Sequence, residues 1–180
     1  MKTNSKSEWV VSLENSAEKI GGEILLIENV MVDYTRPYSE IILNARKREG
    51  KQMDPSEHQA LEIANKCEPS KHEAIKETVV LFRYSDWMRM ELNAGYKKAI
   101  EWGLSNNLCK TTLHVPLAVI EQNPYLFSGI CMSYVVATAN CNNRSYFASY
   151  RRYFRSDVGA GTYCQFQSGL KEAWFSFIIK

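Results

Sequence analysis

Histidine is scarce in this 180-residue chain, which contains only three. Because histidine is the usual proton shuttle near neutral pH and a common metal ligand, few sites of either kind can be built. The sequence also has no P-loop, no His-Glu-x-x-His helix, no Gly-x-Ser-x-Gly elbow and no Pro-Cys-x-x-Cys deaminase motif. These absences count against the commonest NTPase, protease, hydrolase and deaminase chemistries. We therefore predict no cofactor and no metal.

Long apolar runs are also missing. The longest, residues 130–139, is interrupted by Ser133 and Thr138 and is shorter than the ~20 residues that a membrane helix needs. The first fifteen residues lack the apolar core of a secretory signal. Five widely spaced cysteines without a Cys-x-x-Cys motif are typical of reduced thiols. The sequence predicts a cytoplasmic protein with no membrane partner.

Two Cys-x4-His pairs, Cys67 with His72 and Cys109 with His114, offer the four ligands of a tetrahedral zinc site. A spacing of five residues places Cys109 and His114 on opposite faces of a strand, however. A chain of this length also buries enough surface to fold without a metal. We favour buried cysteines and ordinary histidines over zinc.

Acidic residues are few in the C-terminal half. Residues 1–90 carry 15 Asp/Glu and 13 Lys/Arg, whereas residues 91–180 carry 5 and 9, so the net charge of +2 combines −2 with +4. Glu121 is the only acid between Glu101 and Asp157. Such a local positive field indicates an anionic partner. Arginines at the rim of an aromatic core are the structural alternative.

The composition, 45% hydrophobic and 23% charged, is that of an ordinary globular protein. The length predicts one domain over residues 1–180. We expect an α+β fold in which a C-terminal antiparallel β-meander packs against two or three helices from the middle of the chain. The expected parts are a flexible 1–7, N-terminal strands in 8–34, a mainly helical 39–103 and a mainly antiparallel sheet in 108–180.

The first 103 residues supply the evidence for the helices. Trp9–Val11 and residues 24–32 are β-prone and predict strands, and a helix is expected over about 40–48. Asp54-Pro55-Ser56-Glu57 and Ser70-Lys71-His72-Glu73 resemble capping boxes, so each predicts the start of a helix. Ser85-Asp86 begins the longest expected helix, which ends at Gly103.

Beyond residue 107 the sequence becomes rich in β-branched and aromatic residues. The expected strands are 108–115, 130–139, 145–154, 162–166 and 173–179. Asn-Pro, Asn-Asn and Gly-Ala-Gly sequences separate them, and the segment Val158–Cys164 is interpreted as a turn rather than a phosphate-binding loop. Within 145–154 the aromatic spacing also fits a helix face, but the flanking turn residues favour a strand.

An arginine- and tyrosine-rich stretch is the strongest chemical signal. Guanidinium groups bind phosphate bidentately, and aromatic rings stack on bases. The predicted ligand-binding residues are Arg144, Tyr146, Tyr150, Arg151, Arg152, Tyr153 and Arg155. The leading hypothesis is a non-enzymatic binding protein for a phosphate-bearing ligand, either nucleic acid or nucleotide.

Two other functions stay open. The helix expected before Gly103 carries more tryptophan and methionine than one core face needs, which suggests a protein interface. The residues of this predicted interface, serving a homo-oligomer or a protein partner, are Trp87, Met88, Met90 and Trp102. The second alternative is a small metal-independent enzyme with His114 as its general base.

Overall fold

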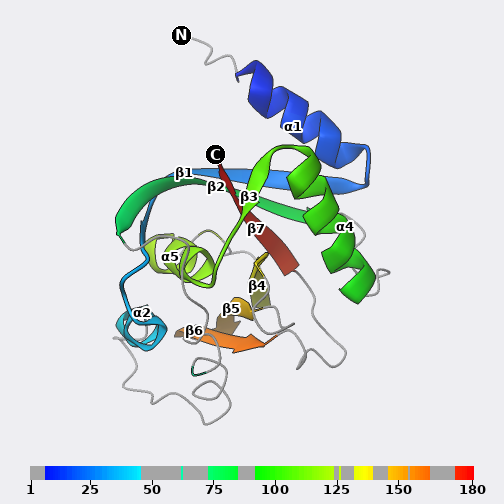
Figure 1. The fold of residues 1–180 in the computed structure, drawn as a ribbon. Coiled ribbons are helices and arrows are strands. Elements are labelled where there is room, and N and C mark those ends of the chain that lie inside the picture. Colours follow the sequence, from blue (N-terminus) through cyan, green and yellow to red (C-terminus); the bar gives the residue numbers. More distant parts are fainter. Residues whose placement is uncertain are drawn as a thin grey trace, which may run out of the picture.

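Seven described strands hydrogen-bond into one mixed sheet in the computed structural model of this chain (Figure 1). The order is β1-β2-β7-β4-β5-β6, and β3 pairs with β7. The strands are β1 (Gly22–Asp33), β2 (Ala74–Tyr84), β3 (Leu108–Lys110), β4 (Met132–Ala137), β5 (Tyr146–Tyr153), β6 (Arg155–Thr162) and β7 (Ala173–Ile179). The described helices are α1 (Glu8–Glu18), α2 (Tyr38–Ala45), α4 (Leu92–Ser105) and α5 (His114–Gln122).

The structure describes residues 7–45, 62, 73–84, 92–123, 126, 132–139, 146–153, 155–162 and 173–180. For residues 42–45, 92–94, 132–134, 146–153 and 155–162 the description covers the backbone alone. Within these ranges, no helix has both the length and the apolar character required to cross a membrane.

β1 and β2 form a long antiparallel pair on one side of the sheet. Their register shifts between Ile27 and Val30, and Asn29 has a φ of 59° at this bulge. Asparagine tolerates the left-handed region better than most residues. Two residues further on, Gln122 of α5 covers the outer edge of β1. Its Oε1 accepts a hydrogen bond from Met31 N at 2.9 Å, and its Nε2 donates to Met31 O at 2.6 Å. The bulge and the amide together protect this edge.

β7 lies at the centre of the sheet and is buried from Trp174 to Ile178. One edge of β7 pairs with β2 in antiparallel fashion. The other edge is shared, because β4 pairs in parallel with its first half and β3 pairs antiparallel with its second half. The junction between β4 and β3 therefore lies opposite Ser176 and Phe177.

Three buried hydroxyl groups, those of Thr111, Thr138 and Ser176, close this junction; each residue is at most 1% exposed. Thr138 Oγ1 accepts from Thr111 N at 2.9 Å and donates to the Ser176 carbonyl at 2.6 Å. Thr111 Oγ1 donates to the same carbonyl at 2.9 Å, and Ser176 Oγ donates to Val136 O at 2.8 Å. Since a buried polar group left unpaired costs about 1–3 kcal/mol, these contacts allow two strands to end in the core. We call these three residues the hydroxyl cluster.

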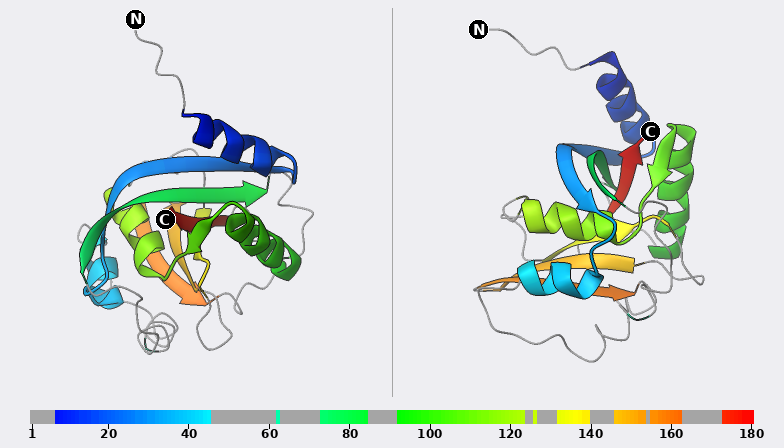
Figure 2. Two further views of the ribbon diagram at one scale, coloured as in Figure 1. Left: turned by 45° about the horizontal axis from the view of Figure 1, so that its top comes forward. Right: turned by 60° about the vertical axis from the view of Figure 1, so that its left-hand side comes forward.

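The sheet separates two apolar clusters, with α2 and α5 on one face and α1 and α4 on the other (Figure 2). Alternation along β4 assigns Val135 to the first face and Val136 to the second. α4 approaches the second face closely at Gly103, where an added Cβ would collide with the Phe177 ring. Gly103 is thus an internal packing residue of α4 and not the end of the helix, which continues to Ser105.

The predicted fold class is confirmed. The protein is α+β, and β4, β5 and β6 form a C-terminal antiparallel meander. Helices from the middle of the chain pack against it, α5 on β4 and β5 and α2 on β6. The segment from Tyr146 to Tyr153 is a strand, as favoured over the helical alternative. The parallel pairing of β4 with β7 was not anticipated.

Several local predictions are wrong. Trp9–Val11 belongs to α1 instead of a strand, because the apolar residues Leu13 and Ala17 continue the helical spacing from Trp9. The Ser70-Lys71-His72-Glu73 sequence is followed directly by β2 and not by a helix. Here the apolar run from Val79 to Phe82, which pairs on both sides, overrides the capping signal.

Two further boundaries differ on the C-terminal side. The strand expected over 108–115 ends at Lys110, and α5 begins at His114. Residues Val158–Thr162 of the expected turn lie instead within β6, where they pair with β5 from Tyr146 to Tyr150. The strand expected at 162–166 and the helix expected after Asp54 lie largely outside the described residues.

The hydroxyl cluster yields a stability prediction. Thr138→Val keeps the side-chain shape but leaves Thr111 N without its acceptor, so we expect unfolding free energy to fall by about 1–3 kcal/mol. Urea denaturation measures this, with Thr78→Val, at a half-buried strand position, as the matched control. Equal effects of the two substitutions would contradict the role of the cluster.

Candidate functional site

The predicted ligand-binding residues lie mainly on the β5–β6 hairpin, apart from Arg144, which is outside the described residues. Tyr146, Tyr150, Arg151, Arg152 and Tyr153 are on β5, and Arg155 begins β6. The turn is very tight, because Tyr153 is the register partner of Arg155. β6 is the last strand of the sheet on this side, so the hairpin lies at the edge opposite β1.

The strand register divides these residues between the two faces. Val135 is opposite Ala148, so Tyr146, Tyr150 and Arg152 share its face, which α2 and α5 cover. Val136 is opposite Phe147, so Arg151 and Tyr153 share the second face, together with Arg155 through its pairing with Tyr153. The predicted ligand-binding residues are therefore divided between the two faces of the sheet. Arg151, Tyr153 and Arg155 belong to the face away from α2 and α5.

An acid lies opposite one of these arginines. Arg151 is the register partner of Asp157, so both belong to the second face. Oppositely charged residues in direct cross-strand pairs stabilise a sheet by about 0.2–1 kcal/mol. Sequence analysis missed this pairing, because it depends on the register of β6, a strand that the sequence did not predict.

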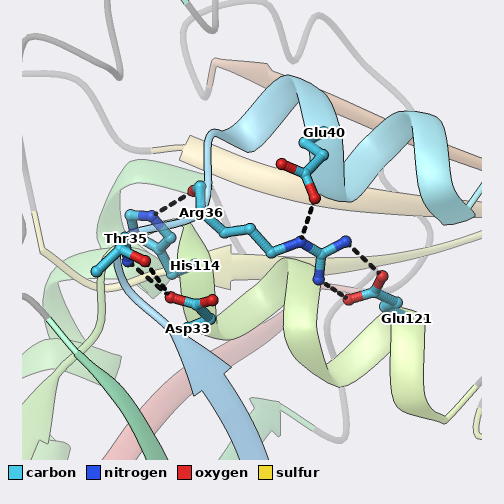
Figure 3. Close-up of polar contacts among 6 residues, drawn as sticks. All are labelled: Asp33, Thr35, Arg36, Glu40, His114 and Glu121. Carbon is cyan, nitrogen blue, oxygen red and sulfur yellow. Dashed lines mark hydrogen bonds and ion pairs between the residues drawn. The ribbon is translucent and has the colours of Figure 1, made fainter.

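A second polar cluster lies where the chain passes from β1 into α2 (Figure 3). Arg36 NH1 and NH2 each donate to one oxygen of Glu121 at 2.9 Å, and Arg36 Nε donates to Glu40 at 3.1 Å. Hydrogen bonding to Glu121, ahead of other influences, raises the pKa of Arg36. All three guanidinium nitrogens are engaged by carboxylates, so this arginine joins α2 to α5. Its four-residue spacing from Glu40 was readable in the sequence, whereas Glu121 lies 85 positions away.

The same loop is fixed by Asp33 at the end of β1. Its Oδ1 accepts hydrogen bonds from Thr35 N at 2.9 Å and from Thr35 Oγ1 at 2.6 Å (Figure 3). This is the local turn that Asp-x-Thr sequences favour. The hydroxyl hydrogen bond is the main reason that the pKa of Asp33 lies below its ordinary value.

His114, the first residue of α5, lies beneath this loop and is 5% exposed. Its ring packs against Tyr38 with centroids 4.3 Å apart and against Tyr34 at 5.5 Å. Nε2 lies 3.2 Å from the Arg36 carbonyl, and Nδ1 lies 3.3 Å from Thr112 Oγ1. Because a carbonyl only accepts, Nε2 carries the proton and Nδ1 accepts from the threonine hydroxyl.

These contacts argue against His114 as a general base. Both ring nitrogens are hydrogen-bonded within the protein, and burial lowers the pKa of His114 to about 4 despite the Arg36 carbonyl and the Asp33 charge. A general base must instead reach a substrate proton. In its neutral form, His114 connects the start of α5 to the loop that carries Arg36.

A buried phenol and carboxylate adjoin His114. Tyr34 Oη lies 3.4 Å from Glu77 Oε1, and both residues are buried. Burial, reinforced by Glu77, raises the pKa of Tyr34 well above its ordinary value. The hydroxyl therefore stays protonated and available as a donor to the carboxylate. Sequence analysis missed this pair because its members are 43 positions apart.

The residues of the zinc alternative are not brought together in the described part of the chain. Cys67 and His72 lie outside it, Cys109 is a half-buried free thiol on β3, and His114 uses both nitrogens. Among the described residues no group of three or more His, Cys, Asp or Glu side chains could hold a metal.

Trp102 corrects the predicted interface. It is 5% exposed, lies stacked on Phe82 at 4.5 Å between ring centroids, and donates from Nε1 to Ser16 Oγ at 3.0 Å. It joins α4 to α1 and to the sheet, so it belongs to the core and not to a contact surface. Trp87, Met88 and Met90 lie outside the described residues.

No protein-family model matches the sequence, and no curated protein or solved structure with detectable similarity was found. Functional assignment therefore rests on the residues themselves.

The neutral state of His114 predicts an acid-sensitive stability. Its pKa is about 4 in the folded protein and near 6.5 when unfolded, so the unfolded chain takes up the proton first. The His114 contribution is complete above pH 6.5 and is lost as the pH falls towards 4, by about 3 kcal/mol at most. The lowered pKa of Asp33 places its titration below this window.

Urea denaturation at several pH values between 4 and 7 measures the loss. His114→Gln, which retains an amide donor for the Arg36 carbonyl, should show a smaller decrease over this range than the unmodified protein. Parallel pH profiles for the two proteins would show that His114 is not the group responsible.

Proposed function

We propose that this chain is a non-enzymatic binding protein for a phosphate-bearing ligand, either nucleic acid or nucleotide. The proposal is supported chiefly by the register of β5 and β6, in which Arg151, Tyr153 and Arg155 share the face away from α2 and α5. Guanidinium groups provide bidentate phosphate contacts, and a tyrosine ring provides a stacking surface.

The charge distribution is consistent with this choice of surface. Glu121, the only acid between Glu101 and Asp157, is bound on both oxygens by Arg36 and so adds little negative potential. Asp157, opposite Arg151, is the one acid of the hairpin strands. An anionic ligand would compete with Asp157 for Arg151, and this competition separates ligand binding from a purely structural role of the arginine.

Fluorescence anisotropy with a labelled single strand, a labelled duplex and a labelled nucleotide tests the proposal. We expect salt-sensitive binding of at least one probe, since phosphate contacts release counterions. Arg151→Ala with Arg155→Ala should weaken it at least tenfold and, for a polynucleotide, reduce the logarithmic salt slope by about 2. Lys76→Ala, an exposed lysine on β2, is the matched control and should leave affinity unchanged.

Asp157→Asn provides the second arm of this experiment. If Arg151 serves the ligand, removal of the competing carboxylate should tighten binding severalfold. If Arg151 serves only the cross-strand pair, the same substitution should lower stability without affecting any probe. Absence of salt-sensitive binding to all three probes would refute the proposed function.

A further inference from the structure

The apolar stripe of α1 extends beyond the surface that covers it. Leu13 and Ala17 are 2% and 0% exposed, and they anchor the C-terminal half of the helix in the second apolar cluster. Trp9 lies one helical turn before Leu13 on the same stripe but is 39% exposed. Figure 1 shows the N-terminal half of α1 rising away from β1. The apolar stripe of the helix therefore continues, at Trp9, into a position that the rest of the chain leaves exposed.

The helix as a whole is also acidic at its surface. Glu8 and Glu18 are exposed, and the helix sequence EWVVSLENSAE contains no lysine or arginine. A partner for such a helix needs an apolar or aromatic group for Trp9, together with cations for the carboxylates. The required partner chemistry is therefore aromatic and arginine-rich.

The chain itself contains that chemistry, but not within reach of its own α1. The β5–β6 hairpin carries Arg151, Arg152 and Arg155 with neighbouring tyrosines and the single acid Asp157. Figures 1 and 2 show α1 and β6 at opposite ends of the molecule in every view. Contact between them within one copy is excluded by this separation, whereas contact between two copies is not.

We propose that α1 of one copy docks on the β5–β6 hairpin of a second copy. Trp9 supplies the apolar contact, and Glu8 beside it meets the hairpin arginines. The argument for the occupant is charge complementarity, which matches the opposite signs of the two halves of the chain. The surface is the one in the proposed function, but association requires no phosphate ligand.

Such an interface joins two different surfaces, so each copy keeps one α1 and one hairpin unoccupied after pairing. Association therefore continues into chains, or closes into a ring, and grows with protein concentration. It also weakens with salt. An anionic ligand on the hairpin would compete with α1. Without ligand, the hairpin of one copy would be covered by α1 of another.

Light scattering after size-exclusion chromatography, over a range of protein and salt concentrations, tests this model. The helix variant is Trp9→Ser, and the hairpin variant is Arg151→Glu with Arg155→Glu. Leu104→Ser is the matched control, because Leu104 is 51% exposed on α4. We expect concentration-dependent assemblies from the unmodified protein and the control, and monomers from each variant alone, with circular dichroism verifying that all fold.

Mixing the two variants is the decisive step. The helix variant retains its hairpin and the hairpin variant retains its α1, so together they should form a one-to-one pair that cannot grow further. A monomeric unmodified protein at all concentrations, or variants that fail to pair on mixing, would overturn the model. Self-association that persists in the hairpin variant would also overturn it, by showing that α1 pairs with another surface.

The two proposals fail separately. If the unmodified protein does not self-associate but binds a phosphate probe, only the docking of α1 is refuted, because ligand binding uses the hairpin of a single copy. If the protein self-associates but binds no phosphate probe, only the proposed ligand binding is refuted. If both hold, the helix variant should bind the probe at least as tightly as the unmodified protein.

Discussion

The sheet depends on how one strand edge is shared in the core. β7 has β4 and β3 end to end along the same edge, and two strand ends would otherwise leave backbone groups unpaired away from water. The hydroxyl cluster of Thr111, Thr138 and Ser176 pairs them, and Ala139 N adds a hydrogen bond to Thr111 O at 2.9 Å. Because of this junction, the chain can leave β3 for α5 and return as β4 on the same side of β7.

The polar contacts on the α5 face depend on this path of the chain from β3 through α5 to β4. α5 is placed against β4 and β5, and its first residue, His114, holds the loop that leads from β1 into α2. Arg36 then ties α2 to Glu121 at the other end of α5. This face is consequently rich in specific polar contacts. By register, Arg151 and Arg155 of the hairpin belong to the other face.

The sequence predicted the fold class and the central β-rich segments well, because short apolar and aromatic runs such as Val79 to Phe82 and Trp174 to Phe177 are typical of strands buried on both faces. It failed where tertiary pairing overrides a local signal. The cap-like Ser70 sequence leads into a strand, and the glycines of Val158–Thr162 belong to β6. The Arg36–Glu121 pair, 85 positions apart, has no local signal. The arginine–tyrosine stretch was identified, but its division between two faces required the register.

The position of β7 in the chain has a consequence for how this protein is made. The strand at the centre of the sheet is also the last of the seven to be synthesised, following β6 in sequence. Until the ribosome has passed Ile179, the β1–β2 pair and the β4–β5–β6 meander have no common partner. Each presents a long unpaired strand edge during that interval, when unpaired strands are most prone to aggregate. The strand that joins the two half-sheets is therefore the last of the described strands to be made, and a chain that terminated before β7 would be left with two half-sheets instead of a smaller fold.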